Sequence, residues 1–168
     1  VDIISDFVKQ DSRIILLHNE IPTGFPATPR NVGIKAARGR FIAFLDCDDV
    51  LRPNALYEMV KELNKNPKLD FIYSDEDKID FNGKYMEPHF KPDFSPDTLL
   101  SSNYICHFTT LRKSIIEEIG GFRSEYNGSQ DYDLFLRFTE KTNNIYHIPK
   151  ILYHWRMIPS STAASGDS

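Results

Sequence analysis

Three aspartates that could bind a metal stand close together, because Asp46, Asp48 and Asp49 directly follow the apolar run Phe41–Leu45. Such a run is typical of a strand buried on both faces of a sheet. In extended backbone, residues two apart project to the same side, so we expect Asp46 and Asp48 to point together. Paired carboxylates favour Mg²⁺ or Mn²⁺, and substrate phosphates often complete the shell of such ions. The simpler alternative is a turn in which Asp49 caps the next helix, which accounts for one aspartate of the three.

A second stretch suited to chemistry is Gly128–Asp133, where a loop containing glycine leads into a helix. Ser129 is the expected N-cap, which places Asp131 in the first turn, where the helix dipole favours the charged carboxylate. An exposed carboxylate at this place can serve as a general base. The alternative is an aspartate that only compensates the dipole.

Arg30 lies near the amino end of another predicted helix, behind Thr28 as N-cap and Pro29 in the first helical position. We expect that helix to end at Gly39. A helix amino end that carries a guanidinium attracts anions. The alternative for Arg30 is a surface salt bridge.

Further acidic residues, Asp75 to Asp77, follow the apolar triplet Phe71–Tyr73 and precede a hairpin expected at Asn82-Gly83. Loops at strand ends concentrate function, so Asp75 and Asp77 are candidates for contact with substrate. The alternative is that these carboxylates are simply solvated near the hairpin.

Histidines occur at two further places of interest. His154 and Arg156 share one face of the predicted strand Ile151–Arg156, where a polar pair needs either a core partner or a ligand. Cys106 and His107 are neighbours on another predicted strand and therefore face opposite ways. This excludes a thiol–imidazole dyad between the two and favours a core cysteine.

Length and composition narrow the possible classes. The chain has 168 residues, enough for one domain with a real core, and its net charge of −4 argues against a nucleic-acid partner. The two cysteines match no zinc or disulfide spacing, so a reducing, cytosolic compartment is expected. No apolar run approaches the roughly 20 residues of a membrane-spanning helix.

Apolar periodicity predicts helices and strands in alternation. Helices are expected over Val1–Gln10, from Thr28, from Pro53, from Ser95-Pro96, over Lys113–Ile119 and from Ser129; strands are expected over Arg13–His18, Phe41–Leu45, Phe71–Tyr73, Ile105–Leu111, Ile145–Ile148 and Ile151–Arg156. This alternation favours an α/β fold with a mainly parallel sheet. Because ligands collect at the carboxyl ends of such strands, we expect the aspartates at those ends to share one cleft.

In combination, several of these stretches resemble the family 2 glycosyltransferases of the GT-A fold, and most closely the bacterial enzymes that build surface polysaccharide. The stretches are Gly24–Asp49, Tyr73–Lys78, Asn103–His107, Gly121-Phe122, Ser129–Leu134 and Tyr153–Arg156. The resemblance covers nearly the whole chain. It implies a Rossmann-like GT-A domain with flanking helices and a small antiparallel hairpin.

The resemblance also implies roles for individual residues. Asp46 and Asp48 would form the family's Asp-x-Asp motif, with Asp46 near the ribose and Asp48 on Mn²⁺ or Mg²⁺; His154 would complete the metal shell, and Asp131 would be the base. Arg30 and Asn31 are expected to contact the nucleotide sugar. The expected acceptor contacts and supporting residues are Asp75, Asp77, Gln130, Trp155 and Arg156.

This sequence departs from the family in two respects. The family usually has Glu where this chain has Gln130, and it opens with a first strand and a second βα unit that bind the nucleotide base and that we do not find here. We therefore expect residues 1–168 to form a single, partial GT-A domain that lacks these first units. Arg13–His18 would then lie at a free sheet edge, which invites self-association.

The function implied is transfer of a sugar, with inversion and a metal ion, from a nucleotide-diphosphate sugar to a saccharide or lipid-linked saccharide, as in polysaccharide or O-antigen synthesis. The protein is expected in the cytoplasm or at the inner face of the membrane. Two alternatives remain open: a non-catalytic fragment that binds carbohydrate or nucleotide, and a phosphatase of the haloacid dehalogenase type, whose nucleophile motif resembles Asp46–Val50.

Overall fold

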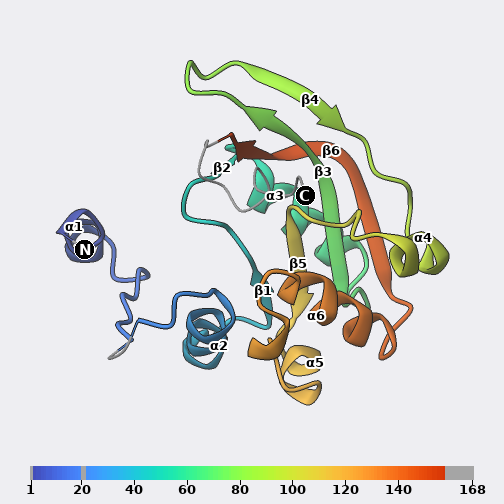
Figure 1. The fold of residues 1–168 in the computed structure, drawn as a ribbon, viewed down its shortest axis with the longest axis horizontal. Coiled ribbons are helices and arrows are strands. Elements are labelled where there is room, and N and C mark those ends of the chain that lie inside the picture. Colours follow the sequence, from blue (N-terminus) through green and yellow to red (C-terminus); the bar gives the residue numbers. More distant parts are fainter. Residues whose placement is uncertain (1, 20–21, 158–168) are drawn as a thin grey trace.

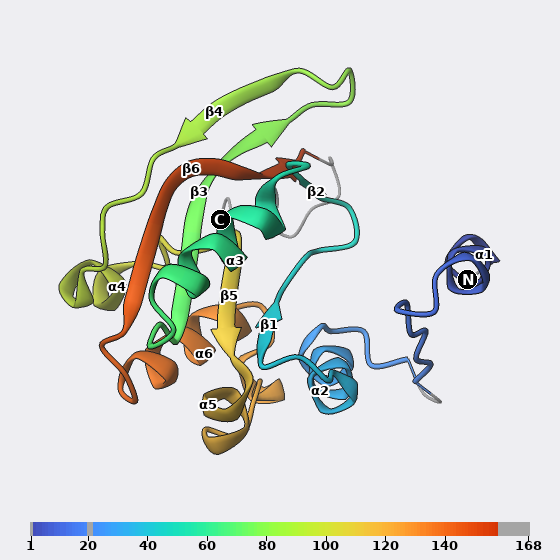
Figure 2. The same ribbon diagram turned by 180° about the vertical axis from the view of Figure 1, so that it is seen from behind.

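The computed structural model describes residues 2–19 and 22–157. Figures 1 and 2 show a strongly curled sheet with helices on both faces. The helices are α1 (Asp2–Gln10), α2 (Ala27–Ala36), α3 (Ala55–Lys65), α4 (Pro96–Ser101), α5 (Lys113–Glu118), the 3₁₀ turn η1 (Ser124–Tyr126) and α6 (Gln130–Thr139). The strands are β1 (Phe41–Ala43), β2 (Val50–Leu51), β3 (Phe71–Ile79), β4 (Tyr85–His89), β5 (Thr109–Arg112) and β6 (Ile145–Arg156).

The sheet has the order β1-β5-β3-β6-β2, with β4 paired to β3. The α/β class is confirmed, but the expectation of a mainly parallel sheet is wrong. Among the described strands only β3 and β6 pair in parallel, and the other pairings are antiparallel. Hydrophobic periodicity reports which faces a strand buries and not its direction, so a reversed β5 reads the same as a parallel one.

The two faces of the sheet carry separate cores. Helices α2, α5 and α6 cover one face, where Ile34, Ile116 and Phe135 pack with Phe71 and Tyr73 of β3. Helix α3 covers the other face, where its apolar stripe packs with the side chains that β3 and β6 turn that way. Alternate residues of β3 therefore serve opposite cores, which explains its nearly continuous burial.

The predicted strand that leads into the aspartates is not buried on both faces. It forms β1, which pairs only with β5 among the described strands and so lies at the edge of the sheet. Phe41 and Ile42 are half-buried, Ala43 is exposed, and Leu45 is 52% exposed. An apolar run on an edge strand looks the same in sequence as one on a central strand, because the sequence does not show the strand's neighbours.

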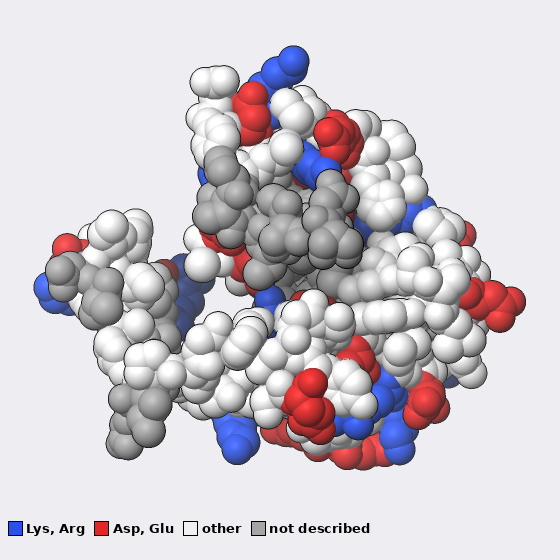
Figure 3. Space-filling model, viewed as in Figure 1, with Lys and Arg blue, Asp and Glu red and all other residues white. Residues whose placement is uncertain are grey.

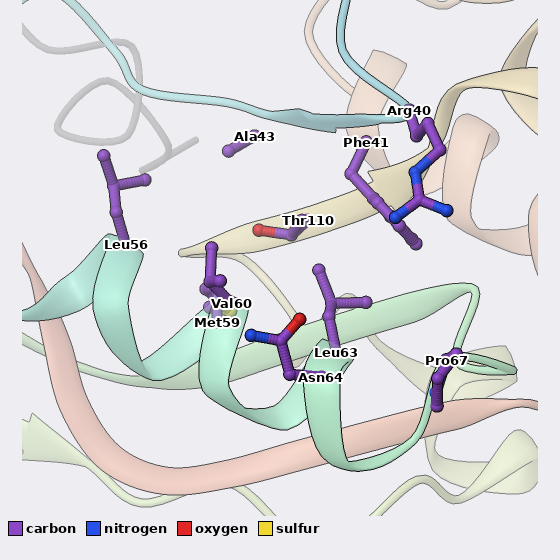
Figure 4. A pocket seen from close by; sticks show the side chains of 10 residues that line it. All are labelled: Arg40, Phe41, Ala43, Leu56, Met59, Val60, Leu63, Asn64, Pro67 and Thr110. Atoms are coloured by element: carbon purple, nitrogen blue, oxygen red, sulfur yellow. The ribbon is translucent and has the colours of Figure 1, made fainter.

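A groove of about 400 Å³ opens between β1 and helix α3, on the face that α3 covers. Figure 4 shows Leu56, Val60 and Leu63 of α3 on one side of it, facing Phe41 and Ala43 of β1. Arg40, Met59, Asn64, Pro67 and Thr110 complete its lining. Leu56 and Val60 are more than half exposed, so this part of α3 is an apolar surface that the described residues do not cover.

The first part of the chain lies apart from the sheet. Helix α1 forms as expected, but Arg13–His18 is not a strand, and Ile14, Ile15 and Leu17 are exposed. Figure 3 shows the α1 segment standing off from the rest, and on the same face acidic side chains lie among basic ones. Residues 13–18 therefore form no edge of the sheet, and β1, β2 and β4 are the described strands with one partner each. Self-association through an exposed edge stays a prediction.

The acidic triplet after Phe71–Tyr73 lies inside a strand rather than beyond its end. Strand β3 continues through Asp75, Glu76 and Asp77 to Ile79, and all three acidic side chains are buried. Three successive acids are typical of a solvated loop, but in the structure each of them has a basic partner: His147 and His154 on β6 for Asp75 and Asp77, and the loop residue Lys91 for Glu76. The hairpin at Asn82-Gly83 is confirmed, with Gly83 at φ 79° and β4 returning along β3.

Helix boundaries follow the sequence signals unevenly. Ser95 caps α4 as expected, and its hydroxyl accepts a hydrogen bond from the Thr98 amide. Helix α2 begins at Ala27 and ends at Ala36, earlier than the predicted Thr28 cap and Gly39 stop. Helix α3 begins two residues after Pro53, with Asn54 in the cap position. In the described residues no helix is long and apolar enough to cross a membrane.

Gly120 and Gly121 end α5 as predicted, both with positive φ angles of 82° and 71°. The second glycine also lies against Asn31 of α2, where a Cβ would come within 2.5 Å of the Asn31 Oδ1. That amide accepts a hydrogen bond from the Phe122 N–H at 2.9 Å and donates one to the Phe122 carbonyl at 2.8 Å. Asn31 therefore joins α2 to the chain that follows α5.

We expect Gly121→Ala to lower the free energy of unfolding by about 2–4 kcal/mol, because it adds a left-handed alanine and displaces the Asn31 amide. Gly120→Ala is the matched control: its φ is also positive, but nothing lies within 4 Å of the new Cβ. It should lose only about 1–2 kcal/mol. Urea unfolding at equal m-values measures both, and equal losses would contradict the close packing against Asn31.

Candidate functional site

The aspartates after β1 form a tight turn. The Asp49 N–H donates to the Asp46 carbonyl at 3.2 Å, and Cys47 and Asp48 occupy the corner. The extended backbone from which we expected Asp46 and Asp48 to project to the same side is therefore absent. The alternative of a turn is right, but Asp49 does not cap the next helix, since strand β2 and Asn54 come between.

Arg30 links the two stretches that the sequence singled out. Its guanidinium donates to Asp131 Oδ1 at 2.5 Å and, through its other terminal nitrogen, forms a short ion pair with Asp46 Oδ1. The Arg30 side chain is only 17% exposed, and it lies against the rings of Phe44 and Phe122. Both carboxylates raise the Arg30 pKa, although burial opposes them. Residues 46 and 131, far apart in the chain, thus share one cation.

Asp131 lies in the first turn of α6, as predicted, and Ser129 is the residue before the helix, although its side chain makes no capping bond. Gln130 holds the turn instead. Its Oε1 accepts a hydrogen bond from the Gly128 N–H at 2.7 Å, and its Nε2 donates to Asp131 Oδ2 at 2.9 Å. Each oxygen of Asp131 therefore has a donor, which fixes the direction of the carboxylate.

Tyr153 and Arg156 of β6 hold the aspartate turn in place. The Tyr153 hydroxyl donates to Asp49 Oδ2, and it lies 3.3 Å from the Asp46 N–H, which donates to it. Arg156 donates from its backbone N–H to Asp49 Oδ1 and from Nε to the Asp48 carbonyl, each at 2.7 Å. Burial raises the pKa of Asp49 despite these bonds. Arg156 thus supports the turn, and its predicted contact with acceptor stays a prediction.

His154 and Asp77 form a buried pair. The His154 Nδ1 makes a short hydrogen bond to Asp77 Oδ1, and β6 places His154 opposite Val50, two residues after Asp48. A carboxylate on one ring nitrogen is the usual support for a histidine whose other nitrogen binds a metal. Among the described residues, however, no three side chains of the ligand types gather as a ready metal site.

Several predicted substrate contacts are bonded inside the protein in this structure. Asp75 is 2% exposed, and its Oδ1 is bonded to His147 Nε2 at 2.7 Å and to the Lys91 N–H at 2.9 Å. Asp77 is 7% exposed and bonded to His154. Both amide atoms of Asn31 are bonded to Phe122. The contacts of these residues with substrate stay predictions. Trp155 is partly exposed, with the Lys78 ammonium 5.3 Å from its ring centroid, and its acceptor contact stays a prediction.

His107 is part of the site although sequence reasoning set it aside. Its Nε2 lies 4.0 Å from Asp46 Oδ2, and its Nδ1 lies 3.2 Å from Glu76 Oε2. The strand predicted over Ile105–Leu111 begins only at Thr109, so His107 lies on a loop beside the aspartate turn. The sequence suggested Cys106 as a partner of His107, because the two residues are neighbours in the chain. In the structure the partner is Glu76 on β3, and no short-range sequence pattern shows that this acid lies beside His107.

These groups close around a small space. Arg30, Asp46, His107, Asp131 and Tyr153 surround about 10 Å³, together with Phe44, Cys106, Thr109 and Phe135. This is about the smallest space that holds one water molecule. Burial raises the pKa of the Cys106 thiol well above its usual range, which agrees with the expected core cysteine. The site is assembled, but a ligand must separate its ion pairs to enter.

We expect Arg30→Gln to lower the free energy of unfolding by about 1–3 kcal/mol at pH 7, because two partly buried carboxylates lose their shared cation. Urea unfolding measures this loss. Arg13→Gln, which breaks an exposed pair with Asp11, is the control and should barely change stability. A loss in Arg30→Gln no larger than that of the control would show that the bridge does not stabilise the fold.

Comparison with known proteins identifies the family of this chain. Residues 1–120 match the family described as Glycosyl transferase family 2. The chain is 38% identical over 164 residues to the O-antigen biosynthesis protein RfbC of Myxococcus xanthus, and 26% identical over 155 residues to a chondroitin synthase of Pasteurella multocida. These alignments cover 98% and 92% of this chain.

The fold resembles the crystal structure of S. aureus TarS 1-349 in complex with UDP-GlcNAc, with a TM-score of 0.72 over 98% of this chain at 18% identity. The chain spans about half of that structure (49%), and 13% and 16% of the length of the two relatives. The match to the family includes the Asp46–Val50 stretch on which the phosphatase alternative rested, and so replaces that alternative. The chain belongs to glycosyl transferase family 2.

Proposed function

We propose that this chain transfers a sugar from a nucleotide-diphosphate sugar to a hydroxyl group of a saccharide or lipid-linked saccharide, with inversion and with a divalent metal ion, in the synthesis of surface polysaccharide or O-antigen. Family membership and the names of the relatives support the transferase class and the polysaccharide product. The complexes of TarS with UDP and UDP-GlcNAc support a nucleotide-sugar donor. A location in the cytoplasm or at the inner face of the membrane is part of the proposal.

The observation that carries the proposal is the Asp46–Arg30–Asp131 bridge, because it brings a donor-side acid, a cation and a candidate base together from three separate elements. A departing nucleoside diphosphate needs positive charge, which Arg30 can supply. An acceptor hydroxyl needs a carboxylate at a fixed place, which Asp131 supplies at the amino end of α6.

In this structure Arg30 is paired with Asp131, the carboxylate that should accept the proton of the acceptor hydroxyl. An incoming diphosphate competes with Asp46 and Asp131 for the same guanidinium. As Arg30 turns toward the diphosphate, Asp131 Oδ1 loses its ion pair and becomes free to accept the hydroxyl proton, while Gln130 still holds Oδ2 in direction. On this account donor binding precedes activation of the acceptor.

Inversion fits the number of carboxylates. A single displacement needs one base, whereas two steps with retention need a second carboxylate as nucleophile, by the logic of the glycosidases. Asp49 is bound to Tyr153 and Arg156, and this proposal assigns Asp46 to the donor side and Asp48 to the metal, so none of the three is assigned as a nucleophile. Asp131 remains as the base.

The residues present fit a divalent ion. No hydrogen bond or ion pair from the described residues engages the Asp48 carboxylate at the corner of the turn, and Asp77 binds Nδ1 of His154, which leaves Nε2 for a metal. Mg²⁺ is commonly held by one or two protein ligands together with substrate phosphates and water, so two protein ligands suffice. When bound, the ion would neutralise charge on the diphosphate.

We expect Asp131→Asn to keep donor affinity within a few-fold while lowering the rate of transfer by roughly 10²–10⁴, the usual contribution of a positioned base. Asp97→Asn is the control, because Asp97 is an exposed aspartate in the first turn of α4. Release of nucleoside diphosphate, followed in the presence of acceptor, measures the rate. Weak donor binding with a normal maximal rate would mean that another group takes the proton.

We expect Asp48→Asn to abolish the Mn²⁺-dependent part of nucleoside-diphosphate binding, and His154→Gln to weaken it by roughly 10–100-fold, as for other losses around a metal site. Calorimetric titration with UDP, with and without Mn²⁺, measures both variants. Neither change should prevent folding, which circular dichroism checks. Unchanged Mn²⁺ dependence in Asp48→Asn would overturn the metal assignment, and binding without any turnover in the unaltered protein would favour the non-catalytic alternative.

A further inference from the structure

A buried chain of alternating charges lies behind the aspartate turn. Lys91, whose side chain is fully buried, places its Nζ 3.5 Å from Glu76 Oε2. The same oxygen accepts a hydrogen bond from the His107 N–H and lies 3.2 Å from His107 Nδ1. His107 Nε2 in turn faces Asp46 Oδ2 at 4.0 Å. The row of charged groups from the core to the site is thus Lys91, Glu76, His107 and Asp46.

This network fixes the loop that carries His107. Lys91 Nζ donates to the carbonyl of Ile105 at 2.9 Å and to that of His107, so the loop is held from behind by a buried ammonium. The imidazole also stacks on the Tyr153 ring, with centroids 4.9 Å apart and planes at 14°. Burying Lys91 and Glu76 is costly unless the pair is well bonded. The fold therefore keeps an expensive arrangement whose exposure rises toward the site, to 28% at the His107 side chain and 37% at that of Asp46.

The charges around the imidazole favour its cationic form. Burial lowers the His107 pKa, but the hydrogen bond and charge of Glu76 and the charge of Asp46 raise it further than burial lowers it, against a smaller opposing effect of Lys91. Asp49 interacts with the same ring electrostatically, and its partner Tyr153 lies beneath that ring. A cation on Asp46 Oδ2 complements Arg30, which holds Oδ1.

We propose that His107 is a positioning residue for the donor site, which holds Asp46 by its second oxygen when Arg30 leaves the first to bind the diphosphate. This rests on the proposed function, in which Arg30 changes partners. Without His107, Asp46 would lose its only remaining side-chain cation among the described residues at the moment the donor enters. The expected deficit is therefore in donor binding rather than in the transfer step.

Steady-state kinetics of the whole protein with UDP-GlcNAc as the probe donor separate these effects. We expect His107→Gln and His107→Phe each to raise the donor KM about 10-fold or more, with kcat within three-fold, and circular dichroism checks that both variants fold. Phenylalanine keeps the stack on Tyr153 and removes both ring nitrogens, so normal donor KM in that variant would overturn the proposal. His89→Gln is the control, since His89 Nδ1 lies 3.6 Å from the other Glu76 oxygen and is exposed. An equal effect in the control would also overturn it.

A second measurement needs no donor. In the protein alone, Asp46→Asn should lower the pKa of the His107 imidazole, because the charge of Asp46 raises it; NMR of the ring protons follows this pKa. An unaltered His107 pKa would show that the imidazole does not hold Asp46. If the unaltered protein transferred no sugar from any nucleotide donor, the proposed function would fail, and the NMR result would still decide whether His107 and Asp46 are coupled.

Discussion

The structure of the site depends on one electrostatic constraint: two carboxylates approach each other only with a cation between them. Arg30 satisfies this for Asp46 and Asp131, and in doing so it ties the amino ends of α2 and α6 to the turn after β1. A guanidinium suits the task because its nitrogens bond to both acids at once and its charge persists at every physiological pH. The same property makes it a natural partner for a diphosphate, so the bridge that assembles the site also closes it.

Near this bridge, charged side chains are buried in the core of the protein. Asp75, Glu76 and Asp77 occupy the middle of a buried strand, and each has a basic partner, in His147, in Lys91 with His107, and in His154. Apolar residues at these places would be at least as stabilising in general. Their retention beside the aspartate turn is consistent with a role in holding side chains of the site, since buried ion pairs fix direction as well as charge.

The sheet edge sets the site's other boundary. Strand β1 carries the turn at its carboxyl end, and among the described strands it is paired on one side only. Grooves lie on both faces of that edge, one against α3 and one against α2. Asp46 is therefore anchored from the interior by β5, β6 and the His107 loop rather than from the edge. This explains why the bonds that position the turn come from Tyr153 and Arg156.

The sequence by itself determined much of the local structure: the hairpin at Asn82-Gly83, the Ser95 cap, the glycine stop after α5, and the place of Asp131 in a first helical turn. These follow from short-range backbone chemistry, which neighbouring residues settle among themselves. Tertiary structure alone decided that β5 runs antiparallel, that Asp75 is sealed in the core, that Asn31 serves the fold, and that His107 reaches Asp46. Burial and ion pairing depend on partners 16 to more than 100 residues away in the chain. No local sequence pattern shows which residue will be the partner.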